Sequence, residues 1–391
     1  MIISIRTFLI FLFSFKFLLD FFSPLRELNF LMFNGVCIIF LIIKMKELKL
    51  IPMREWGGVL VFLLFCTIWL IQGVDKMFYI KYLSMILVYL TIKIAASYLD
   101  AYDFVYISKK VLNIFVALIS INYILSFIVA NPLAREFFNF EHVNLLGSYI
   151  LLSFVFVHLN SQNLESYKYQ RFGLVGYSLL STSTGALLSS LMTFVKIKAI
   201  RLSVILKATA VFILAIVVLF LILKIYSPEL FRKIFSPFQM LVDGEFSNLI
   251  NLAKNRMPIQ DLGEQYSSSL IWRFYSYLIF WTYLIEQPIF TLLFGDGFWG
   301  FSKVWGGIAP HNDFLLILID FGLIAFSIFM YYLIKIFIWC LKADLIILPL
   351  ILMLILRFMF ENNIYSYYIL SGLVMNISFL YFYKQKQRYC Q

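Results

Sequence analysis

The chain has 391 residues, of which 62% are hydrophobic and only 14% are charged, and its mean hydropathy is +0.91. These polar side chains are too few to cover a water-soluble globule, so the composition excludes that class and indicates a polytopic membrane protein. The formal net charge of +11 does not indicate a nucleic-acid partner, because the basic residues stand in short segments between apolar stretches, where they act as topology signals.

Apolar stretches that can cross a hydrocarbon core, which takes roughly 20 residues each, recur along the chain. In chain order they are 5–22, 28–43, 56–72, 77–98, 111–130, 143–159, 202–226, 312–334, 344–360 and 364–383. The first has no small-residue cleavage site and runs into further spans, so we interpret it as a retained helix. Flanking positive charges predict cytoplasmic termini, and by parity they leave residues 227–310 outside.

A shorter apolar stretch, 172–195, carries inside-type charge at both ends, in Arg171 and Lys196. One span would violate the charge rule, whereas two half-length helices joined at "STSTG", residues 181–185, would satisfy it. Such a re-entrant turn would face protein or a water-filled cavity, because lipid cannot satisfy its backbone groups. The alternative is a single helix whose hydroxyls bond its own carbonyl groups.

The segment 227–310 is the only long stretch that is not expected to span. Within it, "SSSLIWRFYSYLIFWTYLIEQP" begins with helix-start residues and ends at Pro288, which predicts an amphipathic helix along the outer interface or over the cavity. We therefore expect an all-α polytopic membrane protein with about 10–12 transmembrane helices, the short pair included. Residues 1–391 would form a single membrane domain, with 227–310 as its large periplasmic loop.

Two outer residues are candidates for chemistry. His311 precedes a span at its outer lip, where an imidazole can exchange protons near neutral pH and act as a general base; alternatively it is an interfacial residue at a helix start. Arg273 stands on the outer helix, where a guanidinium can hold phosphate oxygens or can simply reach the interface as a snorkelling side chain. Arg256 is a further outer cation that would bind an anionic substrate or be solvated.

Other polar residues enlarge this candidate site. Arg357 and Glu361 share a helix face, and either form an intrahelical ion pair or take part in function. His142 and Asn144 precede another span at its outer end. Asp320 lies about 13 Å deeper than His311, so we interpret it as a packed or hydrogen-bonded acid. The cysteine spacing and the carboxylate pattern indicate no metal site.

Three stretches together resemble the O-antigen polymerase and ligase superfamily of bacterial envelope glycosyltransferases. They are "STSTGALLSSL", "WRFYSYLIFWTYLIEQPIFTLLFGDGF" and "HNDFLLILIDFGLIAF", and the resemblance covers roughly residues 140–335. In the last stretch His311, Asn312, Asp320 and Gly322 match the family pattern, and Arg273 matches the arginine of the outer helix. Thr184 stands where the family often has arginine, a difference that favours the polymerase branch.

The resemblance implies transfer of a glycan from an undecaprenyl-diphosphate carrier to a sugar hydroxyl of another lipid-linked repeat unit. The reaction would take place at the periplasmic face of the bacterial inner membrane and without metal or cofactor. Arg273, with Arg256, would hold the diphosphate, and His311 would orient or deprotonate the acceptor. The remaining residues expected to bind substrate are Asn312, Arg357, His142 and Asn144. The expected partners are the lipid-linked oligosaccharide, membrane lipid and a chain-length regulator protein.

Two alternatives stay open. A ligase would transfer the glycan to lipid A core, and Arg357 could supply the cation that is missing at Thr184. A polysaccharide flippase would place paired ionisable groups near the midplane and tends to have repeated halves. The sequence shows no such repeat and gathers its polar residues at the outer lip, which favours an enzyme over a transporter.

Overall fold

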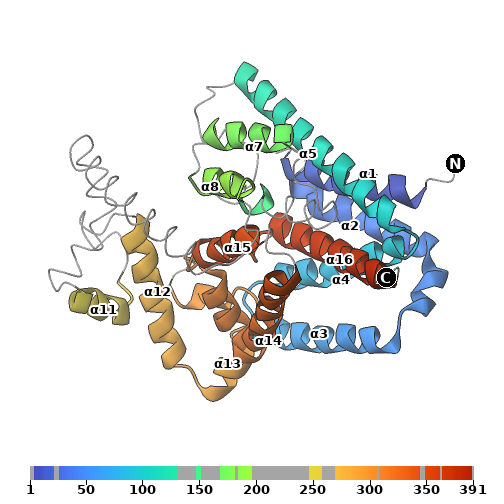
Figure 1. The fold of residues 1–391 in the computed structure, drawn as a ribbon. Helices are drawn as coiled ribbons and strands as arrows, with labels where there is room; N and C mark the ends of the chain where they lie inside the picture. Colours follow the sequence, from blue (N-terminus) through green and yellow to red (C-terminus); the bar gives the residue numbers. More distant parts are fainter. Residues whose placement is uncertain are drawn as a thin grey trace. The chain divides into compact units, whose positions relative to one another are not determined.

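The computed structural model is helical, with no strand, over the residues that it describes (Figure 1). These residues are 4–21, 26–129, 147–150, 168–180, 184–195, 246–257, 269–305, 308–343, 348–361 and 363–389. The helices are α1 (Ile5–Phe21), α2 (Arg26–Ile43), the 3-10 helix η2 (Met45–Leu50), α3 (Met53–Gln72), α4 (Lys76–Ser97), α5 (Ala101–Val129), α7 (Lys168–Leu180), α8 (Thr184–Met192), α11 (Phe246–Lys254), α12 (Ser269–Ile285), α13 (Ile289–Phe294), the 3-10 helix η7 (Gly300–Lys303), α14 (Asp313–Ala343), α15 (Leu348–Phe360) and α16 (Tyr367–Tyr389).

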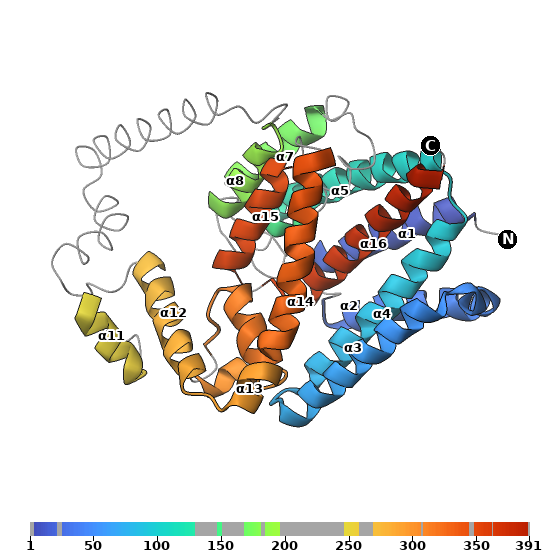
Figure 2. The same ribbon diagram turned by 60° about the horizontal axis from the view of Figure 1, so that its bottom comes forward.

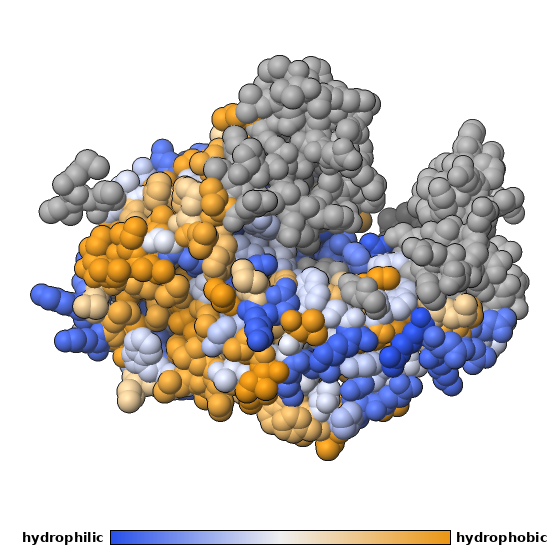
Figure 3. Space-filling view, turned by 180° about the vertical axis from the view of Figure 1, so that it is seen from behind, coloured by the Kyte–Doolittle hydropathy of each residue, from blue (hydrophilic) through white to orange (hydrophobic). Residues whose placement is uncertain are grey.

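Four of these helices are long and apolar enough to cross a membrane, as expected of an α-helical membrane protein. The spans are Met53–Gln72, Lys76–Ser97, Ala101–Ile121 and Asp313–Ile338, and Leu28–Ile43, Leu348–Phe360 and Tyr367–Tyr383 are shorter apolar helices. Hydrophobic side chains cover broad areas of the surface, as Figure 3 shows for one face. The predicted total of about 10–12 spans stays a prediction, since the stretch 202–226 and most of 143–159 lie outside the described residues.

The chain forms two compact units. The first contains Met1–Ile71, Asp75–Lys196 and Lys335–Gln391, and the second contains Gln72–Val74 and Ile197–Ile334. A single membrane domain over 1–391 stays a prediction.

In the first unit, α4 packs against α16 and α2, while α1 packs against α5. Helix α16 also contacts α5. Aromatic side chains pack in the α5–α16 and α1–α5 interfaces: the ring centroids of Phe104 and Phe379 lie 4.5 Å apart, and those of Phe17 and Phe115 lie 4.8 Å apart. The start of α4 is fixed by Asp75, whose carboxylate accepts a hydrogen bond from the Met77 amide at 2.7 Å and so satisfies a free helix-end N–H group.

Helices α7 and α8 confirm the prediction of two half-length helices in place of one span. Arg171 donates to the Thr193 carbonyl at 3.3 Å, and the Ser190 hydroxyl approaches the Leu174 carbonyl at 3.4 Å. Because residue numbers rise along one helix as they fall along the other, the two helices are antiparallel. The depth of this hairpin in a membrane stays a prediction, and residues 181–183 of its turn lie outside the described residues.

In the second unit, α12 confirms the helix predicted within 227–310. Helix α11 packs along it, and the Tyr275 hydroxyl lies 3.1 Å from the Leu252 carbonyl and 3.0 Å from the Met257 carbonyl. Helix α14 is kinked at Gly322, where φ is +77°. The kink lies inside the stretch 312–334, which the sequence predicts as one uninterrupted span. The periplasmic position of this unit stays a prediction.

Candidate functional site

His311 lies at the start of α14 and faces α12. Its ring is in edge contact with the Trp272 indole, with 4.7 Å between the ring centroids, and its carbonyl accepts a hydrogen bond from the Tyr277 hydroxyl at 3.3 Å. The backbone of His311 is left-handed, with φ at 49°, which costs about 1 kcal/mol or more for a residue with a side chain. Contacts on both its ring and its backbone therefore hold His311 in this conformation.

Arg273 belongs to the same part of the second unit. It directly follows Trp272 and stands four residues before Tyr277, so it shares a helix face with the tyrosine whose hydroxyl reaches His311. The structure thus brings α12, with the predicted phosphate-binding arginine, alongside the predicted base. Arg273 is partly buried, and a guanidinium in such a setting interacts with anions more strongly than one in bulk water.

The other predicted residues of this unit occupy different positions. The Asn312 side-chain oxygen caps α14, accepting hydrogen bonds from the amides of Phe314 at 3.0 Å and Leu315 at 3.1 Å. Arg256 pairs with Glu286 at 3.2 Å near the end of α12. Glu286 stands 13 residues after Arg273, about 20 Å along a helix axis. Arg256, which pairs with Glu286, is therefore not brought together with Arg273.

Asp320 is a buried, hydrogen-bonded acid, which confirms the sequence interpretation. Its Oδ1 accepts a hydrogen bond from the Phe301 amide at 2.8 Å. The kink at Gly322 interrupts the hydrogen bonding of α14, and the Ile319 and Asp320 carbonyls instead accept the amides of Asp296 at 2.8 Å and Gly297 at 2.9 Å. The Gly-Asp-Gly turn after α13 is therefore docked on the broken helix through its backbone.

The glycines on both sides of this junction are required by space. A Cβ atom at Gly295 would lie 2.3 Å from the Asp320 carbonyl oxygen, and one at Gly322 would lie 2.3 Å from the Leu293 carbonyl oxygen. Sequence reasoning missed this junction. The signal was present in "FGDGF" and "DFG", but the two are more than 20 residues apart and nothing local shows that they meet.

Asp296 is a polar group of the junction that sequence reasoning also missed. It accepts the Tyr283 hydroxyl at 2.9 Å, and its other oxygen lies 3.7 Å from the Lys303 ammonium. Burial raises the pKa of the Asp296 carboxyl, although the tyrosine and the lysine act in the opposite direction. Burial and the neighbouring carboxylate together raise the pKa of Tyr283. Asp296 thus ties α12 to the turn that supports α14.

Arg357 lies in the first unit and is buried. Its Nη1 is 3.7 Å from Glu361 Oε1, which gives the predicted intrahelical pair, and its Nε is 3.4 Å from the Ser148 hydroxyl. Its carbonyl accepts from Asn363, whose side-chain oxygen in turn accepts from Ser148 at 2.6 Å. Binding of substrate by Arg357 stays a prediction, as it does for His142 and Asn144, which lie outside the described residues.

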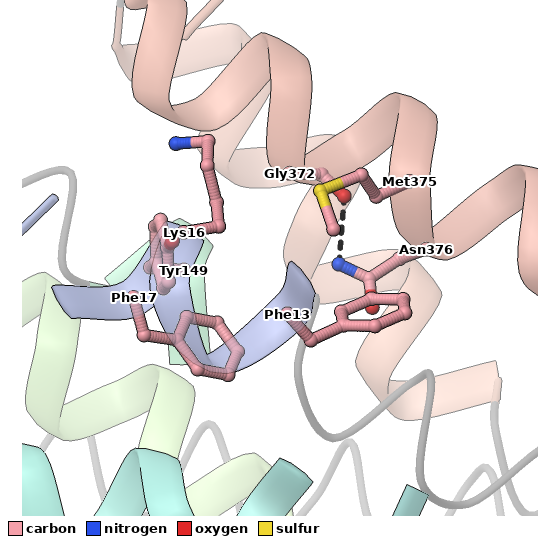
Figure 4. Close-up of a pocket in the computed structure, with 7 residues that line it drawn as sticks. All are labelled: Phe13, Lys16, Phe17, Tyr149, Gly372, Met375 and Asn376. Carbon is pink, nitrogen blue, oxygen red and sulfur yellow. Dashed lines mark hydrogen bonds between the residues drawn. The ribbon is translucent and has the colours of Figure 1, made fainter. Parts of the chain in front are cut away.

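A second buried ionic cluster of the first unit was not predicted. Lys16 and Asp20, one turn apart on α1, form an ion pair, and Asp20 also accepts from Tyr149 and, at 2.6 Å, from Asn29. Figure 4 shows the small cavity beside Lys16. Its volume of about 10 Å³ is room for about one water molecule, so it is too small for a sugar.

Comparison of the chain with models of known families, with curated proteins and with solved structures finds no match in any of the three. The chemistry that the chain can perform therefore follows from the geometry of the second unit. It offers an imidazole held at the start of one helix and a guanidinium on the helix that touches it. Such a pair can stabilise a departing anion and accept a proton from a nucleophile.

Proposed function

We propose that the protein is a membrane glycosyltransferase of the O-antigen polymerase type. It would join undecaprenyl-diphosphate-linked repeat units at the periplasmic face of the bacterial inner membrane. The observation that carries the proposal is the contact of His311 with α12, the helix that bears Arg273.

In the proposed reaction, the acceptor hydroxyl attacks the anomeric carbon of the donor glycan. The new glycosidic bond forms as the bond from that carbon to the phosphate oxygen breaks, and undecaprenyl diphosphate leaves. Arg273 stabilises the negative charge that develops on the leaving diphosphate, because a guanidinium presents a planar fork to phosphate oxygens. His311 accepts the hydroxyl proton and later releases it to solvent.

The support of His311 suits such a role. The ring is placed against Trp272 and the backbone is held by Tyr277, so little freedom is lost when an acceptor sugar binds. Asn312, by capping α14, fixes the residue that follows His311. The exposed apolar surface of the chain fits a substrate whose carrier lipid stays in the bilayer.

The test is replacement of His311 by alanine in the chromosomal gene, followed by gel analysis of surface lipopolysaccharide. A polymerase variant should still insert in the membrane and should yield lipopolysaccharide with a single repeat unit. An unaltered ladder of chain lengths would contradict the proposed base. Phe314→Leu, a substitution on the same helix, serves as a control for insertion and amount.

The same gel separates the ligase alternative. If the protein joins finished glycan to lipid A core, the His311→Ala strain should lose all O-antigen from the core while lipid-linked polymer accumulates. A flippase defect would instead leave repeat units on the cytoplasmic side, and no polymer would form.

A further inference from the structure

Helices α3 and α4 of the first unit are drawn in Figure 2. Side chains of both helices line a groove. The two helices meet where Glu55 accepts the Tyr89 hydroxyl at 2.8 Å and pairs with Lys93, and they are joined in sequence at their other ends by a three-residue connection. Between these points lies a cavity of about 350 Å³. We call it the α3–α4 groove; it is lined by Glu55, Gly58, Val59, Phe62, Met85, Ile86 and Tyr89.

The groove is apolar along its length and opens to the surrounding medium. Leu60, Val61 and Leu64 on α3 are 64%, 53% and 62% exposed, so the apolar wall continues on to the outer surface of this helix. Both helices are long and apolar enough to span a membrane. In a bilayer, hydrocarbon therefore surrounds the groove, and an apolar cavity of this size is large enough for part of a lipid chain or a small ligand.

Close packing against the described residues does not require glycine at Gly57 or Gly58. A Cβ atom built at either position meets no heavy atom within 4 Å, and neither backbone is left-handed. A glycine inside a helix costs about 1 kcal/mol relative to alanine. Gly58 lines the groove, where any side chain would reduce its volume, whereas Gly57 does not line it.

Positive charge gathers at one end of the groove. Residues 44–55 contain four basic and two acidic side chains, and both acids are already paired, Glu47 with Lys44 and Glu55 with Lys93. The remaining cations, Lys46, Lys49 and Arg54, are exposed. Clusters of basic residues at the cytoplasmic end of a membrane helix attract anionic headgroups, each residue strengthening binding by roughly fivefold.

We propose that the α3–α4 groove binds one anionic phospholipid of the bilayer. An acyl chain lies between Gly58 and Phe62 on α3 and Ile86 on α4, and the phosphate lies at Lys49 and Arg54. The expected topology puts this basic end on the cytoplasmic side, away from the proposed glycosyl transfer. The occupant is thus a phospholipid and not the carrier of the transferred glycan.

Native mass spectrometry of the full-length protein in uncharged detergent tests this site. Phosphatidylglycerol and phosphatidylcholine with the same acyl chains are added in steps, and the fraction of lipid-bound protein is measured. The wild type should prefer phosphatidylglycerol. Gly58→Leu and Ile86→Trp, which fill the groove from opposite walls, should weaken binding roughly fourfold for each methylene displaced, whereas the matched control Gly57→Leu should bind as the wild type does.

Charge is tested separately. The double substitution Lys49→Gln and Arg54→Gln should weaken binding of phosphatidylglycerol by roughly 30-fold and leave phosphatidylcholine unchanged, while the control pair Lys109→Gln and Lys110→Gln should change neither. Equal binding of the two lipids, or equal behaviour of Gly57→Leu and Gly58→Leu, would overturn the proposal. Displacement by undecaprenyl diphosphate at lower concentration than by phosphatidylglycerol would overturn it as well.

Discussion

Replacement of Gly322 by alanine should destabilise the second unit, because the kink of α14 has no room for a side chain. The new Cβ atom would lie 2.3 Å from the Leu293 carbonyl oxygen and 2.5 Å from the Gly295 amide nitrogen. Both neighbours are backbone atoms, so neither can rotate away. The left-handed φ of +77° adds strain of its own for any residue with a Cβ atom.

The size of the effect follows from two contributions. A left-handed backbone at a non-glycine residue costs about 1–2 kcal/mol. Relief of the clash requires the turn to move away from α14, which breaks the hydrogen bonds from Asp296 to Ile319 and from Gly297 to Asp320. At about 1 kcal/mol each, these bring the expected loss of unfolding free energy to about 3–4 kcal/mol.

Unfolding by a denaturing detergent in mixed micelles measures this loss, with tryptophan fluorescence as the signal, since Trp299 stands two residues after the Gly-Asp-Gly turn and Trp305 is buried. Gly35→Ala is the matched control, because its Cβ would meet nothing within 4 Å and its backbone is helical. The control should gain up to about 1 kcal/mol. A loss below about 0.5 kcal/mol for Gly322→Ala would refute the docked junction.

Three further predictions follow from other contacts. Because the folded-state pKa of Asp296 is raised, this carboxyl group ionises at lower pH in the unfolded chain than in the folded one. The free energy of unfolding should therefore fall as pH rises from the ordinary carboxyl range to the folded-state pKa. A pH titration of unfolding should show this slope in the wild type and its loss in Asp296→Asn. Lys16→Met alone should lower the free energy of unfolding by about 3–5 kcal/mol, because it leaves Asp20 buried without its charge partner. The double variant Lys16→Met with Asp20→Leu should recover most of this loss in the same unfolding assay. If the losses of the two single variants simply add in the double variant, the two residues do not interact. Arg273→Lys keeps the charge but loses the planar fork, so steady-state kinetics with lipid-linked donor should show a loss of roughly tenfold or more in kcat/KM; wild-type kinetics would rule out a bidentate phosphate contact.

The long apolar helices could be predicted because each depends on a local apolar run, whereas the short helices α11 and α13 were not predicted. The paired helices α7 and α8 could also be predicted from the sequence, since inside-type charge at both ends of a short stretch is a local signal. The kink at Gly322 was not, because a single glycine in an apolar run is compatible with a continuous helix. Its cause is the backbone of residues 293–297, which reaches it only through the folded chain.

The site residues show the same division. His311 could be singled out by residue type and by its place at the end of an apolar stretch, and Arg273 by its charge within the predicted outer helix. The structure adds the contacts between their segments. Asn312 caps the start of α14. This role is compatible with its sequence position, because asparagine is a common residue directly before a helix. Lys16 and Asp20 showed the spacing of an intrahelical pair, but the partner Tyr149 is 129 residues away from the acid.

The most direct test of the proposed transfer is a reaction with purified protein and undecaprenyl-diphosphate-linked repeat units alone. The proposed mechanism predicts that the wild type joins two repeat units and releases one undecaprenyl diphosphate for each bond formed. It also predicts that His311→Ala forms neither product at a comparable rate although it still binds the donor. Equal release of undecaprenyl diphosphate and equal joining by the wild type and His311→Ala would contradict it.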